Sequence, residues 1–185
     1  EAIEFTPVLD EPLGMVSPAG AGKGRKVGVD EATVLQGGRA KNALRAVADG
    51  TPVTLAELTR YPLILPERSH AIRKLLETQA ALSGHKLNVA MEISSVQSIL
   101  ELVRAGHGHA ILTATALAAS SQSEAFVLRP LSEPRLTSTL CLAVSAHKPS
   151  TPLTKQVLRL LRELILAAAE AVPPAPPVRL HNKTR

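Results

Sequence analysis

Short apolar segments alternate with segments of helical periodicity between residues 52 and 113, and this alternation restricts the fold more than any other feature of the chain. Residues 63–65 (LIL) lie between two prolines, residues 88–93 alternate in polarity, and residues 109–112 read HAIL. A strand–helix–strand–helix–strand order predicts parallel strands with right-handed crossovers. Ligands bind such open sheets beyond the carboxyl ends of the strands. We therefore expect an α/β fold with a polar cleft at that edge.

Residues that commonly start or end helices bracket the segments between these strands. A short polar side chain accepts a hydrogen bond from a free N–H group of the first turn, and Glu or Gln three residues later completes a capping box. Glycine ends a helix because it adopts the left-handed conformation without strain. The expected helix starts are Thr54 with Glu57, Ser69, and Ser94 with Gln97, and the expected ends are Gly84 and Gly106.

The first quarter of the chain is less regular. We expect one or two short strands over residues 5–16, broken by Pro7 and Pro12. Residues 17–51 are rich in glycine, which predicts an irregular excursion with at most a short helix over residues 39–48.

The last third predicts two more strands, a long helix and a tail. Residues 125–131 and 136–146 have the composition of strands. Thr151 followed by Pro152 is typical of a helix start, and the helix it opens has an apolar stripe. From Val172 the chain is rich in proline, which predicts a disordered or polyproline-II tail.

The composition indicates which classes of partner the chain can bind. The net charge of +5 favours anionic partners, whereas an aromatic content of 2% argues against a surface that stacks nucleic-acid bases.

Cys141 is the only cysteine, so an intrachain disulfide is impossible, and its apolar surroundings predict a buried thiol. No apolar run approaches the roughly 18 residues of a membrane span. The start has neither a signal-peptide pattern nor an initiator Met, so we expect a piece of a longer protein.

The strongest candidate for chemistry is the turn that follows the LIL strand. Arg68, Ser69 and His70 crowd an expected helix start, where free N–H groups and the helix dipole favour an anion. Arginine adds bidentate recognition of carboxylate or phosphate. Ser94 opens another helix at a corresponding sheet edge, Thr113 ends the 109–112 strand, and both are expected to face the same cleft. The alternative for each is plain helix capping with solvated charges.

Catalytic and metal motifs find little support. The PAGAGKGRK segment lacks the first glycine and the hydroxyl of a phosphate-binding loop. His107 and His109 share a strand face, but no third ligand lies near them in sequence. No G-x-S-x-G motif is present, and Cys141 lies in a strand rather than beside a base. We therefore predict neither enzymatic activity nor a metal or other cofactor.

The chain resembles the effector-binding region of LysR-type transcriptional regulators over residues 5–167, in the order of the segments VTLAELTRYPLILPERSHAIRKLLE, NVAMEISSVQSILELVRAGHGHAIL, FVLRPLSEP and LTSTLCLAVSAHKPSTPLTKQVLRLLREL. LPERSHAIRKLL is similar to the nitrogen-assimilation branch. The resemblance implies a periplasmic-binding-protein-like fold with one complete lobe and part of a second. Its implied divisions are residues 1–61 (partial first lobe with the Gly-rich insert), 62–131 (second lobe), 132–171 (crossover strand and first-lobe helix) and 172–185 (disordered tail).

The same resemblance implies where ligand binds and what the protein does. It places Arg68, Ser69 and His70 at the mouth of an interlobe cleft and residues 92–94 near a hinge, and Thr113 stands where many relatives have Pro. The implied function is small-molecule effector sensing and oligomerisation (dimer or tetramer) in a bacterial, cytoplasmic DNA-binding transcription regulator. The effector would be anionic or polar, no membrane would be involved, and operator DNA would bind only through a winged helix-turn-helix absent from this sequence. The alternative is a fragment of a solute-binding protein from a transport system.

Overall fold

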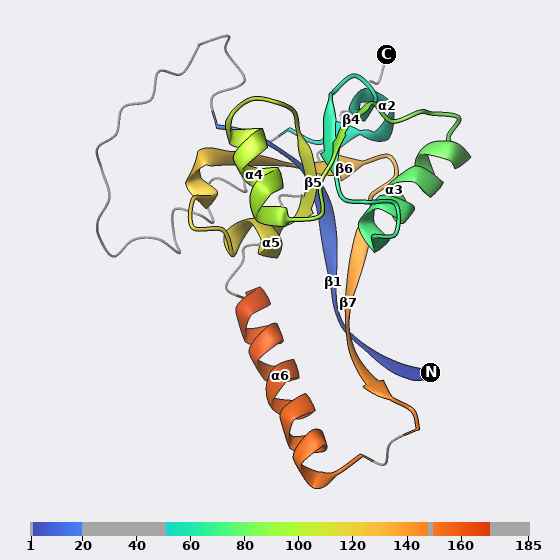
Figure 1. Ribbon diagram of the computed structural model, residues 1–185, viewed down its shortest axis with the longest axis vertical. Coiled ribbons are helices and arrows are strands. Elements are labelled where there is room, and N and C mark those ends of the chain that lie inside the picture. The colour runs from blue at the N-terminus through green and yellow to red at the C-terminus, as the bar shows by residue number, and fades with distance from the viewer. Residues whose placement is uncertain (1, 20–50, 148–149, 171–185) are drawn as a thin grey trace, which may run out of the picture.

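The computed structural model describes residues 2–19, 51–147 and 150–170. In chain order its elements are β1 (Ile3–Pro18), β2 (Val53–Thr54), α2 (Leu55–Leu58), β3 (Leu63–Leu65), α3 (Ala71–Leu82), β4 (Val89–Glu92), α4 (Val96–Arg104), β5 (Ala110–Thr113), α5 (Ala114–Ala118), the 3-10 turn η1 (Ser123–Ala125), β6 (Phe126–Ser132), β7 (Thr137–Ser145) and α6 (Pro152–Glu170) (Figure 1).

The strands join side by side in the order β4-β3-β5-β1-β6-β2. β3 and β4 are parallel, and β1 runs antiparallel to both β5 and β6. A parallel bridge between Leu63 and His109 connects β3 to the start of β5, through N–H···O bonds of 2.8 Å from Ile64 to His109 and 2.9 Å from His109 to Pro62. The strands approach so closely here that a Cβ on Gly108 would lie 2.8 Å from the Pro62 carbonyl oxygen. The predicted parallel arrangement is confirmed.

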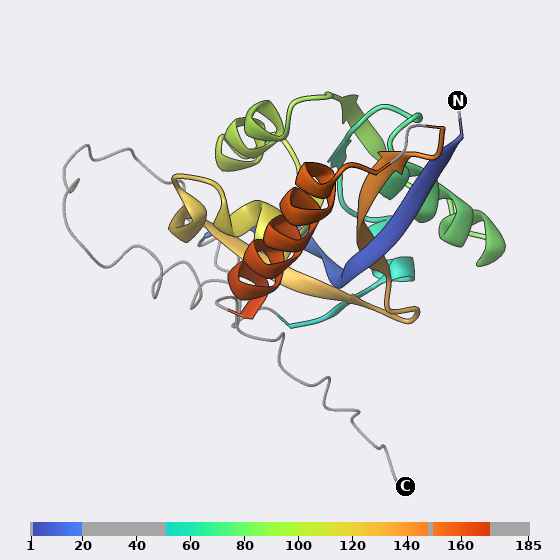
Figure 2. The ribbon, with the colours of Figure 1, turned by 90° about the horizontal axis from the view of Figure 1, so that it is seen from below.

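Helices cover both faces of this sheet. Leu58 of α2 and Leu76 of α3 pack into one buried cluster, with Leu13, Met15 and others of the sheet. Leu100 of α4 and Leu117 of α5 belong to a second cluster on the other face. Figures 1 and 2 show α3 and α4 on opposite sides. Every buried residue among those described lies between Leu13 and Leu136, so this layered part holds the whole described core.

β1 corrects the prediction of short strands broken by proline. It is one continuous strand, with a register shift between Pro7 and Leu9. Pro12 pairs with Thr137 of β7 without ending the strand. In an antiparallel pair only alternate N–H groups point at the partner, so a proline can occupy the others without losing a ladder bond. The first half of β1 pairs with β7 and the second half with β5 and β6, so β1 links the outer and layered parts.

The outer part consists of the β1–β7 ribbon and α6, and it contains no buried residue. The helix start is as predicted, because the Thr151 hydroxyl accepts a 3.1 Å bond from the N–H of Thr154. None of the 19 residues of α6 is buried, however, and Figure 1 shows the helix standing beside the ribbon. The apolar stripe therefore stays exposed at Leu153, Val157, Leu160, Leu161 and Leu164.

Several expectations fall at the limits of the described residues. Ser17 and Pro18, assigned to the irregular stretch, instead complete β1. The rest of the Gly-rich stretch, the option of a helix over residues 39–48, and the tail from Val172 lie outside the described residues. Cys141 is half-buried in β7, so the prediction of a fully buried thiol is wrong. Among the helices described here, none has the length and apolar composition needed to span a membrane.

Candidate functional site

The predicted site lies at the carboxyl edge of β4, β3 and β5. The chain leaves β3 for α3 on one face of the sheet and leaves β4 for α4 on the other. Where neighbouring strands feed helices on opposite faces, their loops separate and leave a crevice at the sheet edge. The turn after β3 and the loop after β4 meet at this switch point, which is where the sequence predicted ligand contacts.

The turn after β3 places Arg68 and Ser69 at its tip. It is closed by a 3.0 Å bond from the His70 N–H to the Glu67 carbonyl. The expected N-cap, Ser69, is wrong by one residue: His70 caps α3, and its Nδ1 accepts a 3.3 Å bond from the N–H of Ile72. The imidazole nitrogen supplies the acceptor that a serine hydroxyl would have supplied, and Ser69 is left exposed to solvent.

Ser94 likewise does not cap the helix that follows it. Ser95 caps α4 and accepts a bond of 3.4 Å from the N–H of Ser98, so the capping box of Ser94 with Gln97 is wrong. The Ser94 hydroxyl instead donates a hydrogen bond to the carboxylate of Glu67. This contact connects the loop after β4 to the turn after β3, and Glu67 is a residue that the sequence reasoning missed.

Thr113 ends β5 and is buried. Its Oγ1 accepts a 3.2 Å bond from the N–H of Ala116 and so caps α5. A hydroxyl that accepts one bond still has its own proton to donate, so capping leaves Thr113 a donor. Among the described residues, no hydrogen bond joins Thr113 to the other four predicted site residues.

Arg73 is not the solvated surface charge that its place near the helix start suggests, because its side chain is only 2% exposed. Its guanidinium lies 2.7 Å from a carboxylate oxygen of Glu77 and 3.2 Å from one of Glu92, and it donates a 3.3 Å bond to the Pro66 carbonyl. Arg73 therefore ties α3 to the ends of both β3 and β4. A signal for this was present, because Arg73 shares the helix face of Leu76 and Ala80.

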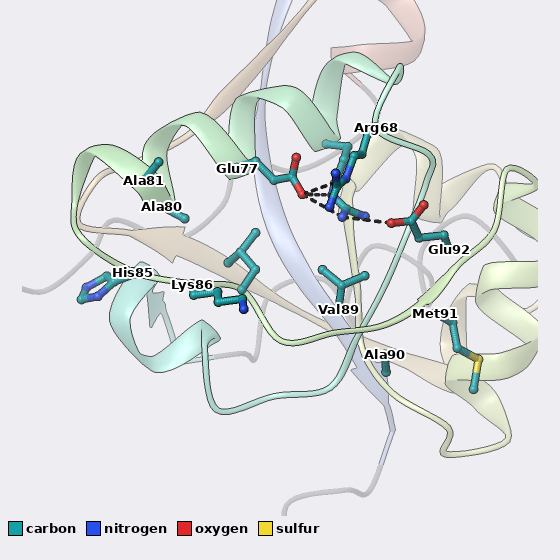
Figure 3. A pocket seen from close by; sticks show the side chains of 12 residues that line it. Arg68, Glu77, Ala80, Ala81, His85, Lys86, Val89, Ala90, Met91 and Glu92 are labelled. Atoms are coloured by element: carbon teal, nitrogen blue, oxygen red, sulfur yellow. Dashed lines mark hydrogen bonds and ion pairs between the residues drawn. The ribbon is translucent and has the colours of Figure 1, made fainter.

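Arg68 has no such attachment. Its side chain is 78% exposed, and the nearest carboxylate oxygen, on Glu77, lies 3.9 Å away. It lines a pocket of about 440 Å³ between α3 and β4, shown in Figure 3. None of the other four predicted site residues lines that pocket. The structure thus groups Arg68, Ser69 and His70 in one turn, joins Ser94 to it through Glu67, and leaves Thr113 one strand away.

A second polar cluster surrounds His109 at the opposite end of the sheet. Its Nδ1 lies 2.8 Å from the Ser17 hydroxyl, and its ring meets Tyr61 edge-on with 5.0 Å between centroids. Arg129 donates a 3.3 Å bond to the Tyr61 hydroxyl. Burial, and then the charge of Arg129, lower the pKa of His109 below its usual 6.5. His107 is exposed, and no three metal-ligating side chains come together within the described residues.

Two transcription regulators are similar to this chain in sequence. It is 28% identical over 121 residues to a probable nitrogen assimilation transcriptional activator of Synechococcus elongatus, covering 65% of this chain and 39% of the relative. It is 29% identical over 135 residues to the HTH-type transcriptional regulator BbuR of Bordetella bronchiseptica, covering 73% and 39%. The chain therefore spans well under half the length of both relatives.

Solved structures share the fold. The CcmR regulatory domain of Synechocystis PCC6803 in complex with 2-PG aligns with a TM-score of 0.64 at 15% identity, covering 88% of this chain and 66% of that one. The effector-binding domain of QuiR in complex with shikimate aligns with a TM-score of 0.61 at 16% identity, covering 88% and 65%. The model of the LysR substrate binding domain family matches residues 1–165. The chain therefore belongs to the LysR substrate-binding domain family, a family of ligand-binding rather than catalytic domains.

Proposed function

We propose that this chain senses a small effector for a bacterial LysR-type transcription regulator, and that the effector binds in the crevice between the turn after β3 and the loop after β4. The observation that carries the proposal is the hydrogen bond from Ser94 to Glu67. It joins the two loops from which α3 and α4 depart to opposite faces of the sheet, and it places a hydroxyl and a carboxylate in the turn that also carries Arg68. The family assignment favours a regulator over the transport-protein alternative.

The side chains at the crevice indicate the chemistry of the effector. Arg68 is solvated and weakly paired, so it is available to a carboxylate or phosphate. Glu67 repels an anion but accepts hydrogen bonds, so it suits a hydroxyl or amine on the same molecule. The effector would thus carry both an anionic group and a hydrogen-bond donor. Shikimate, the ligand in the QuiR complex, has both a carboxylate and hydroxyls.

The strands that leave the layered part suggest how binding would be transmitted. β1 and β7 pair with each other beyond the sheet edge and carry the outer part. An effector that contacts one arrangement of the two parts better than another shifts their equilibrium by that difference in affinity. In the complete regulator this shift would reach operator DNA in the cytoplasm, through a winged helix-turn-helix and self-association into dimers or tetramers.

A thermal-shift screen of small acids tests the proposal. The 185-residue chain is heated with shikimate and with small hydroxy-, amino- and phospho-acids, because a ligand that binds only the folded state raises Tm. We expect at least one acid to raise Tm, and Arg68→Ala and Ser94→Ala to lose that gain. Arg104→Ala is the matched control, since Arg104 is half-exposed and pairs with Glu101 on α4. Equal gains in all three variants would place the ligand elsewhere.

A further inference from the structure

We propose that the pocket between α3 and β4 is a second ligand site, which shares Arg68 with the crevice but none of the other predicted site residues, and which takes a small elongated organic anion with an apolar middle. Its volume of about 440 Å³ is in the range of roughly 300–1,000 Å³ that small-molecule sites occupy. Its lining comes from α3, from the turn before it, and from the chain between His85 and Glu92. Figure 3 shows these side chains around the opening.

The acidic groups of the pocket are already paired with one buried cation. Glu77 and Glu92 both pair with the guanidinium of Arg73, at 2.7 and 3.2 Å. Because Arg73 is almost fully buried, it is fixed between them and cannot turn away to a competing partner. The two carboxylates therefore contribute less than their formal charge to a ligand in the pocket.

The uncommitted charges of the pocket are positive. Arg68 has only the 3.9 Å contact with Glu77, and Lys86 forms no ion pair with any described residue. Both side chains are exposed and line the pocket. Three basic residues, Arg68, Arg73 and Lys86, and two acidic residues, Glu77 and Glu92, line the pocket, so its charged side chains sum to +1 and favour an anion.

The order of the elements sets the two cations apart. α3 starts where β3 ends and returns the chain to the start of β4, which is parallel to β3. Arg68 therefore lies beside Glu92 at one end of the pocket, and Lys86 lies at the other. Between them part of the wall is apolar, with Ala80 buried and Val89 half-buried. Charges at both ends and an apolar middle suit a dicarboxylate with a methylene spacer.

The test is a two-dimensional ¹H–¹⁵N NMR titration of the 185-residue chain with adipate, with neutral 1,6-hexanediol as the matched probe. We expect adipate, and not the diol, to shift the amide signals of residues 80–81 and 86–90. Lys86→Met is expected to weaken adipate binding about tenfold, the loss typical of one charge-assisted hydrogen bond. Lys74→Met, on an exposed lysine of α3 outside the pocket, is expected to leave it unchanged.

A second variant tests shape rather than charge. Ala81 is exposed and lines the pocket, so Ala81→Leu fills the space without entering the core, and adipate binding is expected to disappear. Ala167→Leu, at an exposed position of α6, is the control. Ser94→Ala is expected to leave adipate binding unchanged. This variant therefore distinguishes a failure of the pocket proposal from a failure of the proposed effector site.

Three results would overturn the second site. The first is that adipate shifts no pocket amide, or shifts only those near Ser94 and Thr113. The second is that Lys86→Met and Lys74→Met weaken binding equally, which would leave general attraction to a basic surface. The third is that the pocket signals move with protein concentration rather than with adipate, which would make this free edge of β4 a contact between copies of the chain.

Discussion

The hydroxyl of Ser94 donates a hydrogen bond to the carboxylate of Glu67, although 27 residues separate them in the chain. The contact joins the loop after β4 to the turn after β3, and α4 and α3 then diverge to opposite faces of the sheet. A hydrogen bond between these two loops marks the place where one ligand could contact both of them. The proposed effector site therefore depends on this pair as well as on Arg68.

Arg68→Ala is expected to weaken an anionic effector by about 1.5–3 kcal/mol, the usual contribution of a hydrogen bond to a charged group. The fold is expected to survive, because the Arg68 side chain is 78% exposed and its nearest ion-pair contact is 3.9 Å long. Titration calorimetry with the acid identified by thermal shift measures the loss, with Arg104→Ala as the control. An unchanged affinity would remove Arg68 from the site.

Glu67→Gln tests the opposite charge at the same opening. The amide oxygen can still accept the bond from Ser94, so the loops stay joined, but the repulsion of an anion disappears. We expect a purely anionic ligand to bind more tightly by up to about 1 kcal/mol, as for two charges near each other in water. Glu67→Ala breaks the tie as well and is expected to weaken binding. Calorimetry that finds both variants weakened would show that the charge itself is needed.

Arg73→Met is expected to destabilise the fold. The substitution keeps most of the buried stem but releases two carboxylates and the Pro66 carbonyl. Glu77 and Glu92 are 37% and 48% exposed, so water can solvate them. We therefore expect a loss of about 2 kcal/mol, below the roughly 3–5 kcal/mol of a fully buried pair. Urea denaturation measures it. Arg104→Met, in an exposed pair, is expected to lose less than about 1 kcal/mol, and an equal loss would contradict the prediction.

His109 is expected to make stability depend on pH. Burial and the nearby Arg129 hold its pKa in the folded state below 6.5, whereas the unfolded chain keeps the ordinary value. The unfolded state therefore binds more protons between the two values, so stability is complete above pH 6.5 and falls as the pH drops through that window. Denaturation at several pH values measures the slope. His109→Asn is expected to flatten it, and an identical slope in both proteins would point to another group.

Local signals predicted the elements that depend on neighbours in sequence. The capping box of Thr54 with Glu57 is present with both of its hydrogen bonds. Gly84 and Gly106 have φ values of 70° and 81°, as expected for helix ends. The parallel order of β3, β4 and β5 followed from the alternation of strands and helices. The helix caps and helix-ending glycines depend on atoms within a few residues of one another. The parallel strands depend on the alternation of strand and helix segments along the chain.

Signals that depend on distant partners were missed. Ser95 rather than Ser94 caps α4, and the Ser94 hydroxyl donates a hydrogen bond to Glu67 of another loop. Arg73 is buried because Glu92, 19 residues away, joins Glu77 in neutralising it. Two adjacent residues with suitable side chains can each cap a helix, so sequence alone does not choose between them. The choice is made by contacts that exist only after the sheet has formed.

The confinement of every described buried side chain to the stretch between Leu13 and Leu136 divides the molecule into parts that open independently. Amide hydrogens in the inner half of β1 and in β5 are held by the layered core, so we expect their exchange with deuterium to require global unfolding. Those of α6 lie in a helix that has no buried residue, and helical segments with little tertiary support fray readily. Amide exchange would thus fall into a slow class and a fast class along one chain. A partner packed on the apolar stripe of α6 would slow exchange in that helix and remove the difference.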